Sequence, residues 1–389
     1  MCAGYTLVEL LVAMVVMLAV VAATLTMTSE LHVGFGAASE RVDGQQRLRV
    51  AVDALSRDLF RAGTGAYQGP RVGPLASTVA TVLPFRQGAV RADAPGTFRS
   101  DVMTVSYALP QTAAQTTLRQ PMAAASGTAL IGLEAGCPAG DAACAFSAGM
   151  DVILYDDTGA FDTFRVQSAQ AGSLQLLHTM ADAALSYQAG AQLIEAATHT
   201  YYLKADASTD TFQLMRYDGV ASDAAVVDHV IGLAFEYFGD PSPPALVRSV
   251  TSPIGPWTTY GPKPPPPGVQ TTAYPAGENC VFQLDSTGQP VPRLAALSGG
   301  STTLVKLADT ALRDGPWCPD GGNPHRYDAD LLRIRRVSVT VRVEASLPSL
   351  RGPAGALFAR AGTARAAARW VPDQEIRLDV APPNLNVGR

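Results

Sequence analysis

Residues 4–11 read Gly4-Tyr5-Thr6-Leu7-Val8-Glu9-Leu10-Leu11, and the apolar run that they begin continues to about Met27. The run is long enough to cross a membrane, since a spanning helix needs about 20 mostly apolar residues. Glu9 is its only charged side chain. An Asp at the centre of an inserted helix costs roughly 2.5–3.5 kcal/mol on insertion scales, and we expect a Glu to cost a similar amount. This unfavourable position indicates that Glu9 has a function.

The same stretch resembles the N-terminal processing and assembly signal of type IV prepilins and type II secretion pseudopilins. In that family a Gly ends a short leader, an aromatic residue begins the mature protein, and Glu is the fifth mature residue. The resemblance implies cleavage between Gly4 and Tyr5, methylation of the Tyr5 amino group, and an assembly contact by Glu9. The family more often has Phe at the position of Tyr5, and the leader here (residues 1–4) lacks Lys and Arg. We expect either that the leader's α-amino group suffices for orientation or that the true start lies upstream.

Two other interpretations of the apolar run remain. A cleaved secretory signal peptide would use Val21-Ala22-Ala23 as its small-residue cleavage site. That interpretation lacks a basic region before the run and leaves Glu9 inside the apolar core. An ordinary single-pass anchor gives no reason for Glu9. The prepilin interpretation accounts for Gly4, Tyr5 and Glu9 together, and we prefer it.

The composition predicts a β-rich extracytoplasmic domain with many turns. Only 16% of the 389 residues are charged, below the usual share of about 25%, while the 35 Gly and 28 Pro supply turn formers. The length exceeds that of one typical domain. A formal net charge of −5 argues against a general nucleic-acid-binding surface, and the basic block at residues 333–336 is too short to change this.

The cysteines indicate an oxidising compartment. The chain has Cys2, Cys137, Cys144, Cys280 and Cys318, and removal of the leader would take Cys2 and leave an even number. Cys137 and Cys144 lie close together in a Gly/Pro/Ala-rich loop, so we expect a local disulfide between them. Cys280 and Cys318 would then pair across a Pro-rich segment. A four-cysteine zinc site is the alternative, although the chain has no Cys-x-x-Cys pair.

The pattern over residues 6–63 predicts one long helix with a membrane half (residues 5–29) and an amphipathic half (residues 30–63). Apolar residues in the second half step by four and three, as on one face of a helix. They are Leu48, Val52, Leu55, Leu59 and Ala62, while the polar residues Gln45, Arg49, Asp53, Arg57 and Asp58 fall mostly off that stripe. Gly63 is a helix stop signal. The strands that follow are the only candidate partner for this stripe.

After a loop to about residue 99, short apolar or alternating runs bounded by turn residues predict strands. We expect them at residues 101–107, 152–155, 161–166, 173–177, 199–203, 212–217, 230–238, 331–343 and 374–380, the last at a sheet edge. Between residues 240 and 328 the chain is rich in Pro, Gly, Ser and Thr, which predicts a long insertion. The predicted fold class is α+β: a long N-terminal helix packed on antiparallel sheets in a domain at residues 64–389.

This element order resembles PilW-type minor pilins and, less closely, the J-type minor pseudopilins of type II secretion. The resemblance rests on residues 45–63, 230–237 and 335–341. It implies an inner-membrane protein with a cytoplasmic N-terminus and a periplasmic domain, which later enters a pilus. The implied partners are prepilin peptidase, other major and minor pilins, the inner-membrane assembly platform and membrane lipid, with no direct nucleic-acid binding.

No catalytic motif stands out. Gly-x-Ser-x-Gly, His-Glu-x-x-His, Cys-x-x-Cys and phosphate-binding loops are all missing from the sequence. Asp156-Asp157-Thr158-Gly159 and Asp328-Ala329-Asp330 could offer oxygen ligands to calcium, but these residues also suit turns and strand entries. We therefore expect no cofactor, no metal and no enzymatic activity.

Three functions remain open from the sequence. The first is a type IV pilus minor pilin that primes the filament or is incorporated into it, and the second is a type II secretion minor pseudopilin. The third is a periplasmic binding or adhesion domain that uses the helix only as a membrane anchor. The large domain and the Pro-rich insertion favour the pilus over the secretion system.

Overall fold

The computed structural model describes residues 6–65, 75–77, 79–88, 101–108, 114–133, 137–156, 161–180, 183–206, 208, 211–220, 222–242, 266, 268–270, 274–278, 282–292, 303–313, 315, 329–351 and 371–386. For residues 29–34, 282 and 290–292 only the backbone is described. The chain divides into two compact units. One comprises Met1–Arg49 and Arg342–Ile376, and the other comprises Val50–Val341 and Arg377–Arg389.

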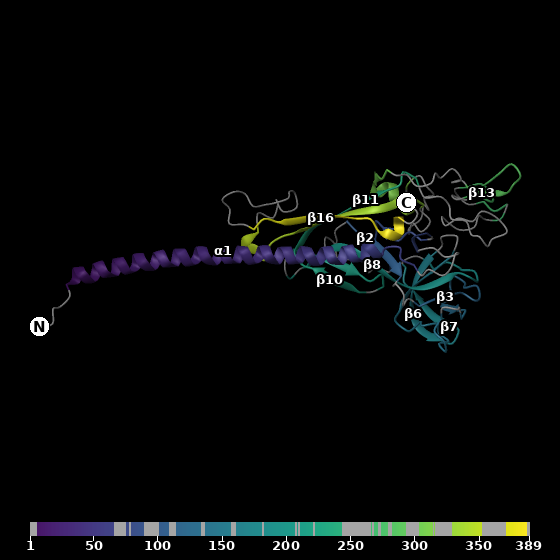
Figure 1. Cartoon of the computed structure of the whole chain (residues 1–389), viewed down its shortest axis with the longest axis horizontal. Helices are drawn as coiled ribbons and strands as arrows, with labels where there is room; N and C mark the ends of the chain where they lie inside the picture. Colours follow the sequence, from purple (N-terminus) through teal and green to yellow (C-terminus); the bar gives the residue numbers. More distant parts are fainter. Residues whose placement is uncertain are drawn as a thin grey trace. The chain divides into compact units, whose positions relative to one another are not determined.

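Helix α1 (Leu7–Arg61) is continuous over 55 residues (Figure 1). The stripe predicted for its second half is confirmed with one change, because Ala51 is fully buried while Val52 is only half-buried. Gly63 follows the helix with φ +72°, a left-handed conformation that glycine adopts without the penalty of a Cβ. The buried members of the stripe are Leu48, Ala51, Leu55, Leu59 and Ala62.

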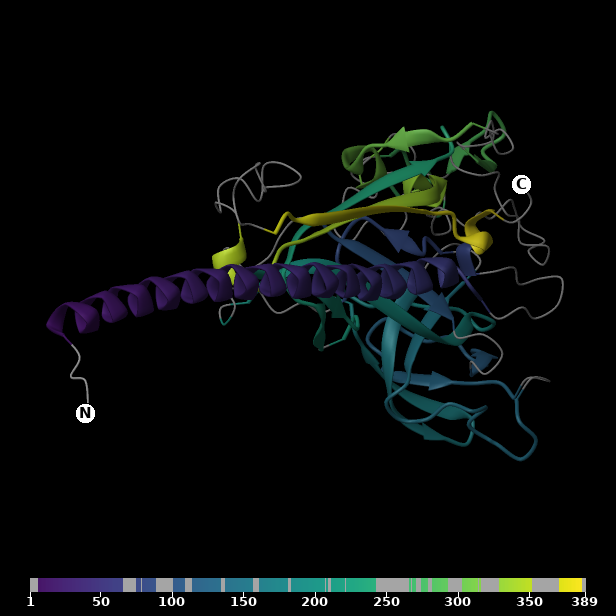
Figure 2. The ribbon, with the colours of Figure 1, turned by 60° about the vertical axis from the view of Figure 1, so that its left-hand side comes forward.

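The last turns of α1 pack on an antiparallel group of strands (Figure 2). Strand β8 is central to this group and pairs with β2 along one side and with β9 along the other. The shorter β1 and β10 extend the group beyond β2 and β9. The bounds are β1 Val82–Leu83, β2 Met103–Ala108, β8 Gln192–Asp206, β9 Thr211–Tyr217 and β10 Asp223–Val227.

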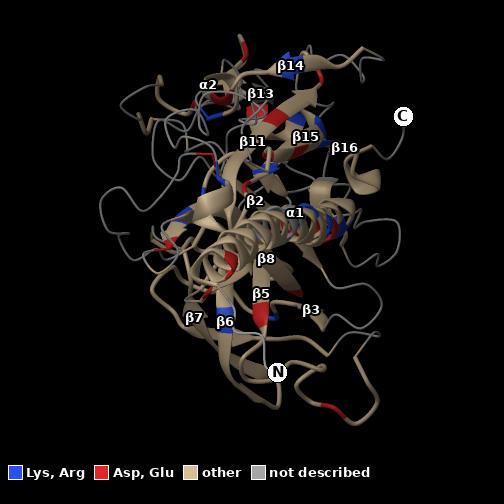
Figure 3. Ribbon diagram, turned by 90° about the vertical axis from the view of Figure 1, so that its left-hand side faces the viewer, with Lys and Arg blue, Asp and Glu red and all other residues tan. Residues whose placement is uncertain are grey.

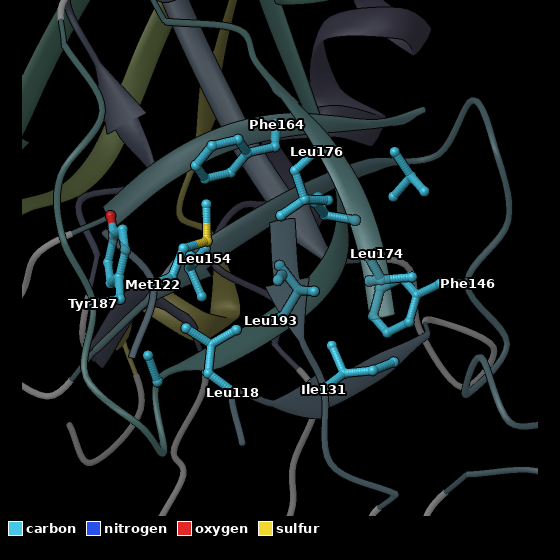
Figure 4. Packing of buried hydrophobic residues seen from close by; sticks show 14 of the residues in the cluster. Leu118, Met122, Ile131, Phe146, Leu154, Phe164, Leu174, Leu176, Tyr187 and Leu193 are labelled. Carbon is cyan, nitrogen blue, oxygen red and sulfur yellow. The ribbon is translucent and has the colours of Figure 1, made fainter. Parts of the chain in front are cut away.

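A small barrel is built from β3, β8, β5, β6, β7 and β4, hydrogen-bonded in that order. The ring closes where Arg119 N donates to Leu130 O at 2.8 Å and Gly132 N donates to Thr117 O at 2.9 Å. Its interior is filled by buried apolar side chains such as Leu154, Phe164 and Leu193 (Figure 4). The remaining bounds are β3 Gln115–Thr117, β4 Thr128–Leu130, β5 Asp151–Tyr155, β6 Phe161–Gln170 and β7 Ser173–His178.

Strand β8 therefore belongs to two cores. Its first residues pair with β3 and β5 of the barrel, whereas the residues from Ala196 onward pair with β2 and then β9. The sequence predicted only residues 199–203 of this strand. The part before residue 199 reads Gln-Leu-Ile-Glu-Ala-Ala-Thr and includes Glu and two Ala, which are depleted in strands, so its strand signal is weaker and pairing with β3, β5 and β2 stabilises it.

A four-stranded antiparallel sheet has the order β14-β11-β15-β16, so β16 lies at an edge as predicted. The bounds are β11 Val230–Gly239, β14 Val305–Leu307, β15 Ile334–Val343 and β16 Gln374–Val380. β15 begins later than predicted because Ala329–Arg333 form the 3-10 helix η3. The expected insertion contributes β14, the short helix α2 (Asp309–Arg313) and the pair β12 (Phe282–Leu284) and β13 (Pro290–Pro292).

In the smaller unit, the middle of α1 is held by the segment that follows β15. Buried Glu40 accepts hydrogen bonds from Ser346 N at 2.7 Å and Ser346 Oγ at 2.6 Å. Gln374 Nε2 donates to Arg41 O at 2.9 Å. Burial raises the pKa of Glu40, but the hydrogen bonds from Ser346 outweigh burial and hold the pKa below its ordinary value. Ala37 packs against Ala345, Leu350 and Val371.

The remaining described elements are short 3-10 helices: η2 (Leu75–Ser77), η4 (Pro348–Leu350) and η5 (Pro383–Asn386). η5 lies against the end of α1, where Asn384 Nδ2 donates to Ala62 O at 3.2 Å and to Thr64 Oγ1 at 3.0 Å. These bonds satisfy a carbonyl that a helix end leaves without an intrahelical partner. The architecture confirms the predicted α+β class, with an apolar N-terminal helix followed by antiparallel sheets.

Candidate functional site: the N-terminal helix

Glu9 lies in the first turn of α1 and forms a capping box with Thr6. The Glu9 carboxylate accepts from Thr6 N at 2.9 Å and from Thr6 Oγ1 at 3.1 Å, and Glu9 N donates to Thr6 Oγ1 at 3.3 Å. The pair satisfies amide groups that have no partner inside the helix. It also places the negative carboxylate at the positive end of the helix dipole. Among the residues that the structure describes, Thr6 supplies the hydrogen bonds to the Glu9 carboxylate, and Thr6 is uncharged.

The helix around Glu9 has the properties of a membrane span. Leu7–Thr28 has a mean hydropathy of 2.7, and none of it is buried in the protein. In the described part of the chain α1 is the one helix that is long and apolar enough to cross a membrane. Its near turns are mostly in the tan of uncharged residues in Figure 3, which looks along α1 from the N-terminal side. An apolar surface this large must be covered by lipid or by other protein.

A shallow groove of about 530 Å³ runs along one side of these turns. Its lining combines two rows of residues spaced by four, so that it lies between two ridges of the helix surface. Glu9 supplies the only charge in the lining. The residues are Val8, Glu9, Val12, Ala13, Val16 and Met17.

At its other end, α1 is fastened to β2 and β8 through the buried carboxylate of Asp58. Tyr107 Oη donates to Asp58 Oδ1 at 2.9 Å, and Tyr201 Oη donates to Asp58 Oδ2 at 2.6 Å. His199 Nδ1 lies 2.7 Å from Asp58 Oδ2. We call Asp58, Tyr107, His199 and Tyr201 the Asp58 cluster. It joins the helix that carries Glu9 to the β-rich domain.

The pKa shifts in the Asp58 cluster follow from its burial and its donors. Burial raises the pKa of Asp58, but the hydrogen bonds from His199, Tyr201 and Tyr107 outweigh burial and hold the pKa below its ordinary value. Burial and the Asp58 charge raise the pKa of Tyr107 to about 12 and raise that of Tyr201 as well. Both tyrosines therefore stay protonated at neutral pH and remain hydrogen-bond donors.

The structure places the predicted site residues as follows. Gly4 and Tyr5, the predicted cleavage and methylation site, lie outside the described residues, as do Cys280 and Cys318. Glu9 lies exposed on the first turn of α1. Cys137 and Cys144 form a disulfide in the loop between β4 and β5. Cys137 and Cys144 are thus part of the barrel and far from Glu9 in sequence.

Among the residues that the structure describes, no group of three or more His, Cys, Asp or Glu could hold a metal ion. Asp157 and Asp328, from the two segments considered for calcium, lie outside the described residues. Asp330 is fully buried, and its Oδ1 accepts from Arg333 Nη1 at 2.6 Å. Its charge is thus compensated by a guanidinium group within the fold.

The capping box between Thr6 and Glu9 and the burial of Asp58 were not predicted from the sequence. The Thr6 signal was present, because Thr-x-x-Glu before an apolar run is the pattern of a capping box. Asp58 was expected off the apolar stripe, yet it is only 3% exposed. Only the position of tyrosines and a histidine on distant strands makes its burial favourable, and the local sequence carries no such information.

Residues 1–25 match a family model described as the prokaryotic N-terminal methylation motif. No curated protein and no solved structure matches the chain. The match supports a type IV pilin-like or pseudopilin precursor and implies a substrate of prepilin peptidase with pilin-type partners. It points to a structural subunit, and with the apolar helix it is consistent with a membrane-anchored pilin.

Proposed function

We propose that the chain is a minor pilin of a type IV pilus, related to the PilW type. Prepilin peptidase cuts between Gly4 and Tyr5 on the cytoplasmic side and methylates the new amino group. The span at Leu7–Thr28 holds the subunit in the inner membrane, with the β-rich domain in the periplasm. From there the subunit enters the filament or primes its assembly.

The observation that carries this proposal is the position of Glu9. It is the single charge of an exposed apolar span whose first residues match the methylation motif. In the described part of the chain the donors to this carboxylate are the neutral groups of Thr6. A neighbouring N-terminal amino group would neutralise it, and opposite charges attract strongly in an apolar environment, whereas either one alone pays its desolvation cost. Pairing with a neighbour thus favours assembly.

Support for the PilW type comes from residues 45–63, 230–237 and 335–341, which lie in the last turns of α1, in β11 and in β15. A type II secretion minor pseudopilin is the alternative, since both classes share the N-terminal motif. The genes beside this one distinguish the two: a set for a pilus retraction and extension machinery supports the proposal, and a secretion set supports the alternative.

Mass spectrometry of the mature N-terminus tests the proposal directly. The expected N-terminal residue is methylated Tyr5. A mature chain that begins at residue 24 would show signal-peptide cleavage, and an uncleaved leader would favour a simple membrane anchor. Either of these results would overturn the assignment, including the secretion alternative.

A further inference from the structure

The groove beside Glu9 has a low point at Ala13. Along the ridge Glu9–Ala13–Met17 the two outer side chains are long, and Ala13 between them has a single methyl group. Successive members of such a ridge lie about 6 Å apart along the helix. The gap over Ala13 therefore lies about one turn along the helix from residue 9 and opens to the same side of the helix as Glu9.

The charge of this groove restricts what can occupy it. Lipid tails match its apolar walls of Val8, Val12 and Val16 but bring no positive charge to Glu9. Residues 5–40 of this chain contain neither Lys nor Arg, so a neighbouring copy of the span could not supply a side-chain cation at this depth. In a neighbouring copy that is processed as proposed, the cation at this depth is the α-ammonium group of the N-terminus, and the first side chain after it is the aromatic ring of Tyr5.

We infer that Ala13 is a positioning residue for assembly: the gap above it receives the N-terminal aromatic ring of a neighbouring subunit while that subunit's ammonium group pairs with Glu9. This inference rests on the proposed function. Assembly would then require space over Ala13 as well as the pairing of charges at Glu9. Ridges of one helix pack into the grooves of another, so a large side chain at Ala13 would fill the gap and hold the neighbour's N-terminus away from the carboxylate.

The test replaces Ala13 by Leu in the full-length chain and uses Ala22→Leu as the matched control. Ala22 is nine residues, or two and a half turns, further on and lies on the opposite face of the helix. Both changes add the same apolar volume to the span. Carbonate extraction measures membrane insertion, and the mass of the N-terminal peptide measures processing. Immunoblotting of sheared filaments measures incorporation.

Ala13→Leu is expected to insert and be processed normally while its level in filaments falls about tenfold or more, and Ala22→Leu is expected to assemble like the wild type. Normal incorporation of Ala13→Leu, or an equal loss with Ala22→Leu, would overturn the inference and leave the proposed function intact. If the wild-type chain itself is unprocessed or absent from filaments, the inference and the proposed function both fail. A photoreactive residue at Val16 gives a second readout, because the inference requires a cross-link to the N-terminal peptide of a neighbour.

Discussion

At the scale of single residues, Asp58 shows how a carboxylate can be both buried and stabilising. Its three side-chain partners come from β2 and β8, and two of them are tyrosines that keep their protons. A buried carboxylate without such donors would cost several kcal/mol. The Asp58 cluster therefore fixes the rotation of α1 against the sheet, since no other rotation presents the carboxylate to all three donors.

Replacing Asp58 by Asn tests this role. The amide group can accept only through its oxygen, so donors of the Asp58 cluster lose their acceptor in the protein interior. We expect a loss of about 1–3 kcal/mol in the free energy of unfolding, measured by chemical denaturation of the full chain in detergent. The control is Asp53→Asn, which alters an exposed pair with Arg57 and should change stability by less than about 1 kcal/mol. Equal effects of the two variants would contradict the prediction.

The pH dependence follows from the same group. Because the pKa of Asp58 is lower in the folded chain than its ordinary value of 3.8, the carboxylate stabilises the fold fully above about pH 4. This contribution disappears as the pH falls through the lowered pKa. Melting temperatures between pH 2 and pH 7 should therefore drop more steeply for the wild type than for Asp58→Asn below pH 4. Parallel curves would show that other carboxylates cause the acid sensitivity.

Glu9 and Asp58 also show what local sequence can reveal. Glu9 was found because a single charge in an apolar run is conspicuous without any neighbour in space. Asp58 lies among Arg57, Asp53 and other polar residues, where a charge is ordinary. Its partners are 49 to 143 positions away along the chain, so only the folded structure distinguishes it from its neighbours.

At the scale of elements, strands with strong alternation or β-branched runs were predicted well, and short ones were missed. β5, β7, β9, β11 and β16 lie close to their predicted positions. β3, β4 and β14 have three residues each, too few for a period of two to emerge from the sequence. These short strands matter, because β3 and β4 close the barrel.

The loop between β4 and β5 gives an element-scale prediction. Its disulfide joins Cys137 to Cys144 across a separation of seven residues, and Cys144 is buried in the barrel core. In the chain-entropy model a ring of this size stabilises the fold by about 2–3 kcal/mol. Cys144→Ser should lower the unfolding free energy by about that amount under oxidising conditions. When reductant is added to both proteins, the wild type and the variant should become equally stable, and a wild type that keeps its advantage in reductant would contradict the prediction.

At the scale of the whole molecule, the assembly role that we propose for Glu9 gives a prediction. Glu9→Gln keeps the side-chain shape and removes the charge, so the span should insert as well as the wild type or better. Without the charge it can no longer pair with a neighbouring ammonium group, and its level in filaments should fall sharply. Immunoblots of sheared filaments and of membranes measure the two effects separately. Glu9→Gln subunits at wild-type levels in filaments would refute this role.

The connection between β2 and β8 has one further consequence. Ala108 at the end of β2 is paired with Ala196 in β8. The chain therefore leaves this pair of antiparallel strands and returns to it at neighbouring positions. The intervening residues, which include β3 to β7, occupy the place of a hairpin turn. Such an inserted segment can be lengthened or replaced during evolution with little change to β2 and β8, because its two ends already lie side by side. Among homologous proteins, the sequence and size of the barrel should therefore diverge fastest, while the contacts of α1 with β2 and β8 are retained.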